Sequence, residues 1–288
     1  MRKKKILVVV IILIAVIISA TILFVVLSIG IPKHKSDSIT NASVSVIATF
    51  RETITQSQTS NYERALSSET TENASEEKEK KLDKAITAPE GFIRLLSICG
   101  TTAEEVNEMA CRQMITVESN GSNAQINFYR FSDNTWTLDS DLSCSGFVGS
   151  NGITENMHEG NYATPKGIFP ISEAFFIHEP PVTGLPLFQI TNDTYWIDDP
   201  DSAYYNRRIE GTVNKDWNSA EHMIDYPVAY EYGFVIDYNK EAVYNAGSAI
   251  FFHVSTSPTA GCIGTDRTMV LKYLQALNIA ENPYIIIV

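Results

Sequence analysis

The stretch "GSAIFFHVSTSPTAGCIGTDRT", residues 247–268, decides how the C-terminal part of the chain is expected to fold. Its apolar run "SAIFFH" is rich in aromatic and branched side chains and predicts a β-strand that ends at His253. The loop "STSPTAG" then leads to Cys262. The following segment, "TDRTMVLKYLQALNI", has apolar residues at helical spacing, and Thr265 or Asp266 can cap its first turn. A strand, a loop and a helix are therefore expected in succession.

This order places a thiol in a setting suited to nucleophilic chemistry. Cys262 is expected just before the helix N-terminus, where the partial positive charge favours a thiolate. The loop is long enough to fold back and bring the His253 imidazole to the sulfur, as a base or as an imidazolium partner. Gly261 leaves the backbone open, so that neighbouring N–H groups can bind an oxyanion.

Two other interpretations of the cysteine are open. A buried, unreactive Cys262 is one of them. A zinc site is the other, but no further Cys or His stands at ligand spacing from the pair, and the chain has no C-x-x-C. We therefore expect no metal.

The chain from about residue 89 to 288 predicts one mainly β domain with a few short helices, a size that suits a single core of about 200 residues. The clearest helices are "TTAEEVNEMACRQM" and the segment after Cys262. Candidate strands are bounded by Gly, Asn, Pro or Asp turns: "GFIRLLSI", "QMITVES", "AQINFYRF", "TWTLDSDLSC", "GIFPISEAFF", "LFQIT", "VAYEYGFVIDYN", "SAIFFHV" and "PYIIIV".

The N-terminus predicts a membrane anchor. Residues 6–31 are an uncharged apolar run, and roughly 25 residues at 1.5 Å rise cross a bilayer with some tilt. The basic tail, residues 1–5, is expected to stay in the cytoplasm and everything after the span to lie outside, on the cell-wall side. The run is too long for a signal peptide.

Residues 32–88 predict a solvated extracellular stalk, because they are rich in Ser, Thr, Glu and Lys and contain too few large apolar residues to form a core. The net charge of the chain is −12, which excludes a broad basic surface for nucleic acid. An anionic substrate must therefore be held by local groups.

Two separated motifs resemble the catalytic domain of the L,D-transpeptidases (YkuD-like). "HVSTSPTAGC" is similar to the family's signature, in which His253, Thr259, Gly261 and Cys262 fit the expected positions. "GNYATPKGIFPI", residues 160–171, is similar to the family's T-P-x-G-x-F segment, which borders the active site. The resemblance covers about residues 112–288.

The chain departs from the commonest family pattern at two positions. Ala260 stands where many members have a second histidine, and Gly264 stands where many have an arginine. We expect Arg267, one helical turn on, to be the replacement for that cation.

The resemblance implies a β-sandwich or mixed-sheet domain and peptidoglycan chemistry without a cofactor. Cys262 would attack a tetrapeptide stem and release D-alanine, and a second stem would complete a 3→3 cross-link. His253 would accept the thiol proton and later assist the incoming amine of the second stem, and Gly261, Thr259 and Ser255 would position the substrate. Donor and acceptor stem peptides would be the partners. Water in place of the acceptor would give L,D-carboxypeptidase activity.

Two further functions remain as alternatives. A sortase-like transpeptidase is expected to have a longer separation between His and Cys and a Thr-x-x-Thr-Cys-like strand end, and neither is present. A catalytically silent wall-binding module would keep the fold, with Ala260 and Gly264 as its support.

The aromatic insert between the motifs supplies further candidates, and its segment "DWNSAEHMIDY" is expected to form a short helix with His222 at its centre. Its rings would either line a flap over the substrate or pack as ordinary surface aromatics. The candidate substrate-binding residues are His222, Tyr204, Trp217, Lys166 and Arg267. The other cysteines, Cys99, Cys111 and Cys144, allow at most one internal disulfide or stay free thiols.

Overall fold

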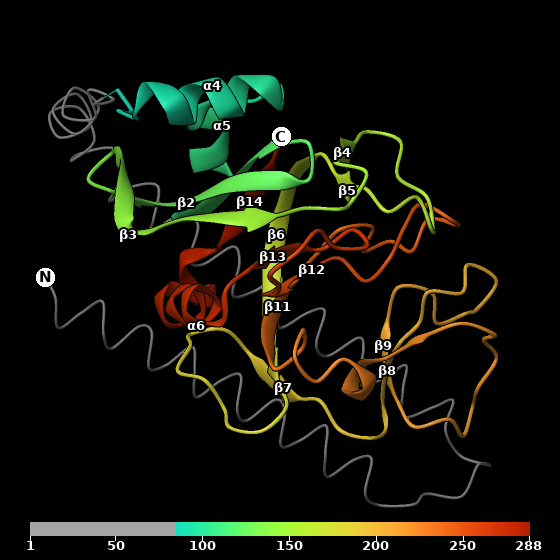
Figure 1. Cartoon of the computed structure of the whole chain (residues 1–288). Coiled ribbons are helices and arrows are strands. Elements are labelled where there is room, and N and C mark those ends of the chain that lie inside the picture. The colour runs from blue at the N-terminus through green and yellow to red at the C-terminus, as the bar shows by residue number, and fades with distance from the viewer. Residues whose placement is uncertain (1–84) are drawn as a thin grey trace, which may run out of the picture. The chain divides into compact units, whose positions relative to one another are not determined.

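The computed structural model describes residues 85–288, which form a mainly β domain with few helices (Figure 1). The predicted cytoplasmic tail, the predicted span at 6–31 and all but the last four residues of the predicted stalk lie outside the described residues. Among residues 85–288, no helix is both long and apolar enough to cross a membrane.

The main sheet of the described residues is mixed and has nine strands. In chain order these are β1 (Gln113–Asn120), β2 (Asn123–Ser132), β3 (Thr135–Phe147), β6 (Gly167–Phe176), β7 (Leu187–Gln189), β11 (Tyr232–Ile236), β12 (Phe251–Val254), β13 (Ile263–Thr265) and β14 (Tyr284–Ile287). Their order is β11-β12-β13-β3-β2-β1-β14-β6-β7, and β11 also pairs with β6. The extra pairing closes eight strands into a ring. The expected mixed sheet is confirmed. The sheet curls on itself, however, and does not form the other expected arrangement, a sandwich of two sheets.

Helices cover this sheet from two sides (Figure 1). The helix α4 (Glu90–Ile98) buries Phe92, Leu95 and Leu96 against Met114 of β1 and Trp136 of β3, with α5 (Ala103–Glu108) beside it. The neighbouring residue on β1, Ile115, belongs instead to the core that holds α6 (Arg267–Ala276). Successive side chains of a strand face opposite sides, which explains how β1 serves both cores.

Two small sheets flank the cysteine loop. The strands β8 (Thr194–Trp196), β9 (Arg208–Glu210) and β10 (Glu221–His222) form a three-stranded sheet in the order β10-β8-β9. The strand β4 (Ile153–Thr154) pairs in parallel with β5 (Thr164–Pro165). Two short 3₁₀ turns, η1 (Met223–Asp225) and η2 (Ile279–Glu281), complete the elements.

Three secondary-structure predictions need correction. The segment "GFIRLLSI" was expected as a strand but is helix α4, because Phe92, Leu95 and Leu96 stand at helical spacing and share one buried face. The helix expected over 101–114 covers only Ala103–Glu108, after which the chain turns into β1. The short helix expected around His222 is instead β10 followed by a 3₁₀ turn.

The packed domain begins before residue 89. Thr87 pairs with Thr135 at an isolated bridge, its carbonyl accepts the Trp136 N–H at 2.8 Å, and Ile86 packs against the core beneath α4. Residues 86–88 therefore belong to the β domain. All four cysteines of the described residues are free thiols.

Candidate active site

The strand register places His253 and Cys262 on one side of the sheet. The strands β12 and β13 run parallel, with His253 opposite Gly264. Cys262 stands two residues before Gly264, and side chains two residues apart share a face of a strand. Cys262 also packs in the same apolar cluster as Phe251, two residues before His253. The loop after His253 does return the cysteine to the histidine's side of the sheet.

The Cys262 thiol is held inside the protein as a neutral group. It is 7% exposed, donates a hydrogen bond to the Ala249 carbonyl at 3.2 Å and accepts one from the Phe251 N–H at 3.4 Å. Burial raises the pKa of the Cys262 thiol far above its ordinary value, and the nearby Glu221 carboxyl raises this pKa further.

The expected thiolate at a helix N-terminus is therefore wrong for this resting structure. The three residues of β13 and the cap residue Asp266 separate Cys262 from α6, which begins at Arg267. Asp266 caps that helix, as expected, by accepting from the N–H groups of Thr268 and Met269. The favourable field of a helix terminus falls off within one turn, so it does not offset the burial of the sulfur.

The His253 imidazole is also buried and neutral. Its Nδ1 lies 2.9 Å from the Val254 carbonyl oxygen, which can only accept, so Nδ1 carries the proton and Nε2 the lone pair. A backbone carbonyl therefore orients the ring. Burial lowers the pKa of His253 to about 4. The Tyr230 ring meets the imidazole edge-on, with centroids 5.3 Å apart.

Hydroxyl groups fasten the cysteine loop. The buried Thr164 Oγ1 donates to the Gly261 carbonyl at 2.7 Å and accepts from the Gly149 N–H at 2.8 Å. Thr259 Oγ1 donates to the Cys262 carbonyl at 2.6 Å. The T-P-x-G-x-F segment does border the cysteine loop. Thr164 was not among the predicted site residues, although this motif contains it.

A cavity of about 180 Å³ opens beside the thiol. Cys262 forms part of its wall, together with three acidic residues, Glu159, Asp198 and Glu221. Its other lining residues are Met157, Gly160, Asn161, Tyr162, Ser248, Ala249, Ile250, Ala260 and Gly261. Small residues at 260 and 261 leave the thiol side of this cavity open.

Two tyrosines hold two of the three acidic side chains of the cavity. The Tyr205 hydroxyl donates to Glu159 at 2.5 Å, and the Tyr230 hydroxyl donates to Glu221. Burial raises the pKa of Glu159 above its ordinary value and raises the pKa of Glu221 to about 7. Glu159 and Glu221 therefore hold protons more strongly than carboxyl groups ordinarily do. Glu159, Asp198 and Glu221 were not predicted, because their proximity depends on the fold of the insert.

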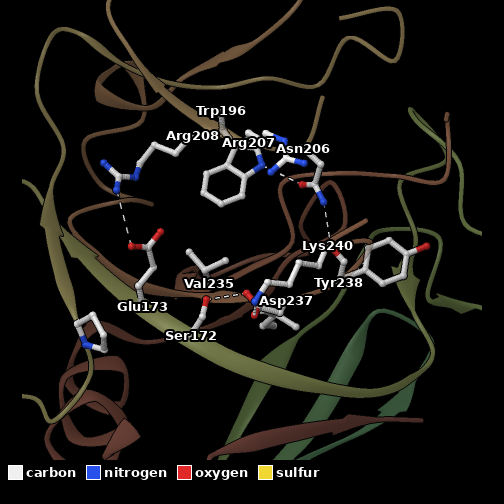
Figure 2. Close-up of a pocket in the computed structure, with 12 residues that line it drawn as sticks. Ser172, Glu173, Trp196, Asn206, Arg207, Arg208, Val235, Asp237, Tyr238 and Lys240 are labelled. Atoms are coloured by element: carbon white, nitrogen blue, oxygen red, sulfur yellow. Dashed lines mark hydrogen bonds and ion pairs between the residues drawn. The ribbon is translucent and has the colours of Figure 1, made fainter. Parts of the chain in front are cut away.

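A larger cavity of about 540 Å³ lies beside β6 and β11, and neither Cys262 nor His253 lines it (Figure 2). Its wall includes the Asn206 amide, whose Oδ1 accepts from Trp196 Nε1 at 2.9 Å and from the Ala249 N–H at 3.1 Å. Figure 2 shows the Asn206 side chain between Trp196 and the backbone of Tyr238. Asn206 thus fixes the residue whose carbonyl holds the Cys262 thiol. We assign the candidate active site to the smaller cavity.

The two departures from the L,D-transpeptidase pattern lie in different surroundings: Ala260 lines the cavity at the thiol, whereas Gly264 is tightly enclosed. A side chain at Gly264 would meet the Ser255 Cβ at 2.3 Å, so the position has no room for an arginine. Ser255 instead donates its hydroxyl to the Ser257 carbonyl at 2.7 Å. The Arg267 guanidinium is engaged by Glu231 at 2.8 and 2.9 Å. Neither Ser255 nor Arg267 lines the cavity at the thiol.

The other candidate substrate-binding residues also lie outside this cavity. Lys166 pairs with Glu155 at 2.6 Å. His222 contacts Asp225 and the Asn192 carbonyl, and its ring stacks on Tyr195. Trp217 is 4% exposed and packs edge-on against Tyr204.

The rings of His222, Tyr204 and Trp217 therefore mainly pack against other residues of the insert.

Among residues 85–288, no group of three or more His, Cys, Asp or Glu side chains is arranged to hold a metal ion.

The sequence matches no protein-family model and no curated protein. Among solved structures, it is similar to the helical cell shape determining protein Pgp2 from Campylobacter jejuni, at 13% identity and a TM-score of 0.35. That match covers 61% of this chain and 47% of the Pgp2 chain. A mutant of the same protein matches at 12% identity and a TM-score of 0.35, over 61% of this chain and 46% of that chain. The matched part thus spans less than half of either solved chain, and a likeness at this level carries no argument about function.

Proposed function

We propose that this chain is a cysteine-dependent L,D-transpeptidase that forms 3→3 cross-links between peptidoglycan stem peptides. One observation carries the proposal: Cys262 lies in the wall of a cavity, and His253 projects from the same side of the sheet with an unprotonated Nε2. The two motifs that resemble the family meet through the hydrogen bond from Thr164 to Gly261.

In the proposed reaction, the Cys262 sulfur attacks the carbonyl that joins the third residue of a donor stem to D-alanine. His253 Nε2 takes the thiol proton and returns it to the departing D-alanine nitrogen, so that a thioester remains. The amine of a second stem then attacks this thioester, an amide forms and the thiol is restored. Water in the same role gives L,D-carboxypeptidase activity.

The resting state favours a neutral pair over a preformed ion pair. Burial raises the pKa of Cys262 and lowers that of His253, so transferring the proton before substrate binds is unfavourable. We therefore propose that proton transfer accompanies attack on the carbonyl, after substrate has replaced the contact between the thiol and Ala249. In this proposal the nucleophile, Cys262, and the base, His253, are both side chains of this chain.

We further propose that the domain works outside the cell, tethered by the apolar run at 6–31 and the Ser/Thr-rich segment that follows it. This orientation follows from the basic residues before the run. Donor and acceptor stem peptides of the wall would then be within reach of the thiol.

The test follows the products of the full chain with a disaccharide-tetrapeptide by mass spectrometry. We expect loss of D-alanine, a cross-linked dimer and a transient acyl group on Cys262. Cys262→Ala should abolish all three, whereas Cys99→Ala, the matched cysteine control, should leave them unchanged. D-alanine loss without dimers would identify a carboxypeptidase. Peptide binding without any product would identify a silent binding module, and full activity of Cys262→Ala would refute the mechanism.

A further inference from the structure

The second half of the proposed reaction needs a base. A primary amine has a pKa of about 10.4, so at pH 7 less than about one acceptor in a thousand carries a free lone pair. The acceptor therefore arrives as an ammonium ion. It must lose a proton before its nitrogen can attack the thioester.

His253 is already needed for a different proton, because the reverse of acylation has its Nε2 pass one amine proton to the sulfur as the thioester opens. Its side chain does not line the cavity beside the thiol, and it is 6% exposed. Its Nδ1–H is bound to the Val254 carbonyl, which leaves Nε2 to serve the thiol. An ammonium group in the cavity meets carboxyl groups instead.

Glu221 is the carboxyl group that links the cavity to both reactive side chains. It lies on β10, where it pairs with Trp196 of β8, and it lines the cavity together with Cys262. The Tyr230 hydroxyl donates to Glu221 Oε2, and the same tyrosine ring meets His253 edge-on. Since Tyr230 can only donate one hydrogen, the rest of the carboxylate is available to a ligand.

From this geometry we infer that Glu221 is a further catalytic residue, the base that takes a proton from the ammonium group of the acceptor. The inference rests on the proposed transpeptidase function and names its acceptor class, a primary amine that is protonated in solution. The observation that supports the inference is that Glu221 and Cys262 line the same cavity.

The proton balance of the step is complete. The ammonium nitrogen gives one proton to a Glu221 oxygen, and its lone pair attacks the thioester carbonyl carbon. When the tetrahedral intermediate collapses, the C–S bond breaks and a second proton passes from nitrogen to sulfur. The products are the cross-linking amide, the Cys262 thiol and the Glu221 carboxylic acid, which then releases its proton to water.

The surroundings of Glu221 suit this role. Tyr230, Tyr226, Asp198, Glu159 and Cys262 are the titratable groups that interact with it. Burial, together with the negative charges of Asp198 and Glu159, raises its pKa to about 7, near the optimum for a base at neutral pH. The buried Asp198 Oδ1 makes no hydrogen bond within residues 85–288, so it is available to an incoming ammonium.

The decisive experiment separates acylation of Cys262 from transfer to the acceptor. Wild-type protein and Glu221→Gln are first acylated with the tetrapeptide donor and then supplied with either a stem-peptide amine or hydroxylamine. Hydroxylamine is mostly unprotonated at neutral pH and needs no base. We expect Glu221→Gln to acylate normally, to slow transfer to the peptide amine by about 10²–10⁴-fold, and to react with hydroxylamine at the wild-type rate.

A purely structural role for Glu221 would slow both acceptors alike, and that result would overturn the inference. Equal transfer to the peptide amine by wild type and Glu221→Gln would also overturn it, while leaving the proposed function intact. Absence of acylation in the wild type would instead refute the proposed function itself. The exposed Glu179→Gln serves as the matched control, with both transfers unchanged.

A second variant tests the same role if Glu221→Gln fails to fold. Tyr230→Phe keeps the ring but removes the hydrogen bond that lowers the pKa of Glu221. The pH below which the transfer rate falls should then be higher than in the wild type. An unchanged pH dependence of the transfer rate would contradict the assignment of Glu221 as the base.

Discussion

The Cys262 thiol donates its hydrogen bond to the Ala249 carbonyl, 3.2 Å away, in the resting protein. Ala249 has a φ of 53° and donates its own N–H to Asn206, so the acceptor of the thiol is fixed on both sides. The thiol is thus held by the backbone of the neighbouring segment, and its hydrogen is already bonded to a carbonyl oxygen in the ligand-free protein.

Alkylation of Cys262 should therefore be slow. Because the pKa of the folded thiol is raised, we expect iodoacetamide at pH 7 to modify it more than about tenfold more slowly than in the urea-unfolded chain. Peptide mapping by mass spectrometry resolves each cysteine, with the less buried Cys99 as the internal reference. Equal rates in folded and unfolded protein would contradict a buried neutral thiol.

The buried His253 should make the protein sensitive to mild acid. Its folded pKa of about 4 lies below the unfolded value of 6.5, so below pH 6.5 the unfolded chain binds a proton that the folded one excludes. Stability is complete above pH 6.5 and is lost as the pH falls toward 4, by up to about 3 kcal/mol. Urea unfolding at pH 7 and pH 5 should show this loss in the wild type and much less of it in His253→Gln. The exposed His158→Gln is the control, and identical pH dependence in all three proteins would refute the prediction.

Thr164 should be needed for the shape of the cysteine loop. Thr164→Val leaves the Gly149 N–H and the Gly261 carbonyl without their partner, which should cost about 1–3 kcal/mol of unfolding free energy. The proposed release of D-alanine should become slower as well, since the carbonyl before Cys262 loses its anchor. Thr164→Ser keeps the hydroxyl and should retain most of both properties. If Thr164→Val matched Thr164→Ser, the hydroxyl would have no such role.

Gly264 and Ser255 should show strong energetic coupling. In Gly264→Ala the new Cβ meets the Ser255 Cβ at 2.3 Å, so we expect a loss of about 1–3 kcal/mol from overpacking. Ser255→Gly should relieve the clash, making the double variant more stable than the sum of the two single changes predicts. Thermal unfolding of the four proteins measures this difference. Strict additivity would mean that the two residues do not contact each other.

Sequence patterns predicted the parts of the fold that depend on local periodicity. The strands β1, β2, β3, β6 and β14 and the helix α6 were located because alternation or helical spacing is strong there. The segment at α4 was misassigned because Phe92 and Ile93 suggested a strand, whereas the spacing of Phe92, Leu95 and Leu96 shows a helical face. The closure of the sheet by β11 and β6 joins segments distant in the chain, and no local pattern encodes it.

The site was predictable only where a motif marked it. His253, Cys262 and the T-P-x-G-x-F segment were predicted as candidates because they match recognisable motif positions, and the structure brings these segments together. The state of the thiol was not predictable, since three strand residues and Asp266 separate Cys262 from α6 and burial depends on distant segments. Glu221 was missed for the same reason. Its environment is created by Tyr230, nine residues away, and by its pairing with β8.

The hydrogen bond from Cys262 to Ala249 also bears on how long the protein survives among oxidants. Peroxides attack thiolates much faster than thiols, and the first product, a sulfenic acid, forms most readily at exposed sulfurs. A sulfur that is 7% exposed and kept protonated therefore resists this damage while it waits. The sulfur becomes vulnerable only when a ligand draws the hydrogen away from the carbonyl, so ligand binding, more than elapsed time, should limit the lifetime of this thiol.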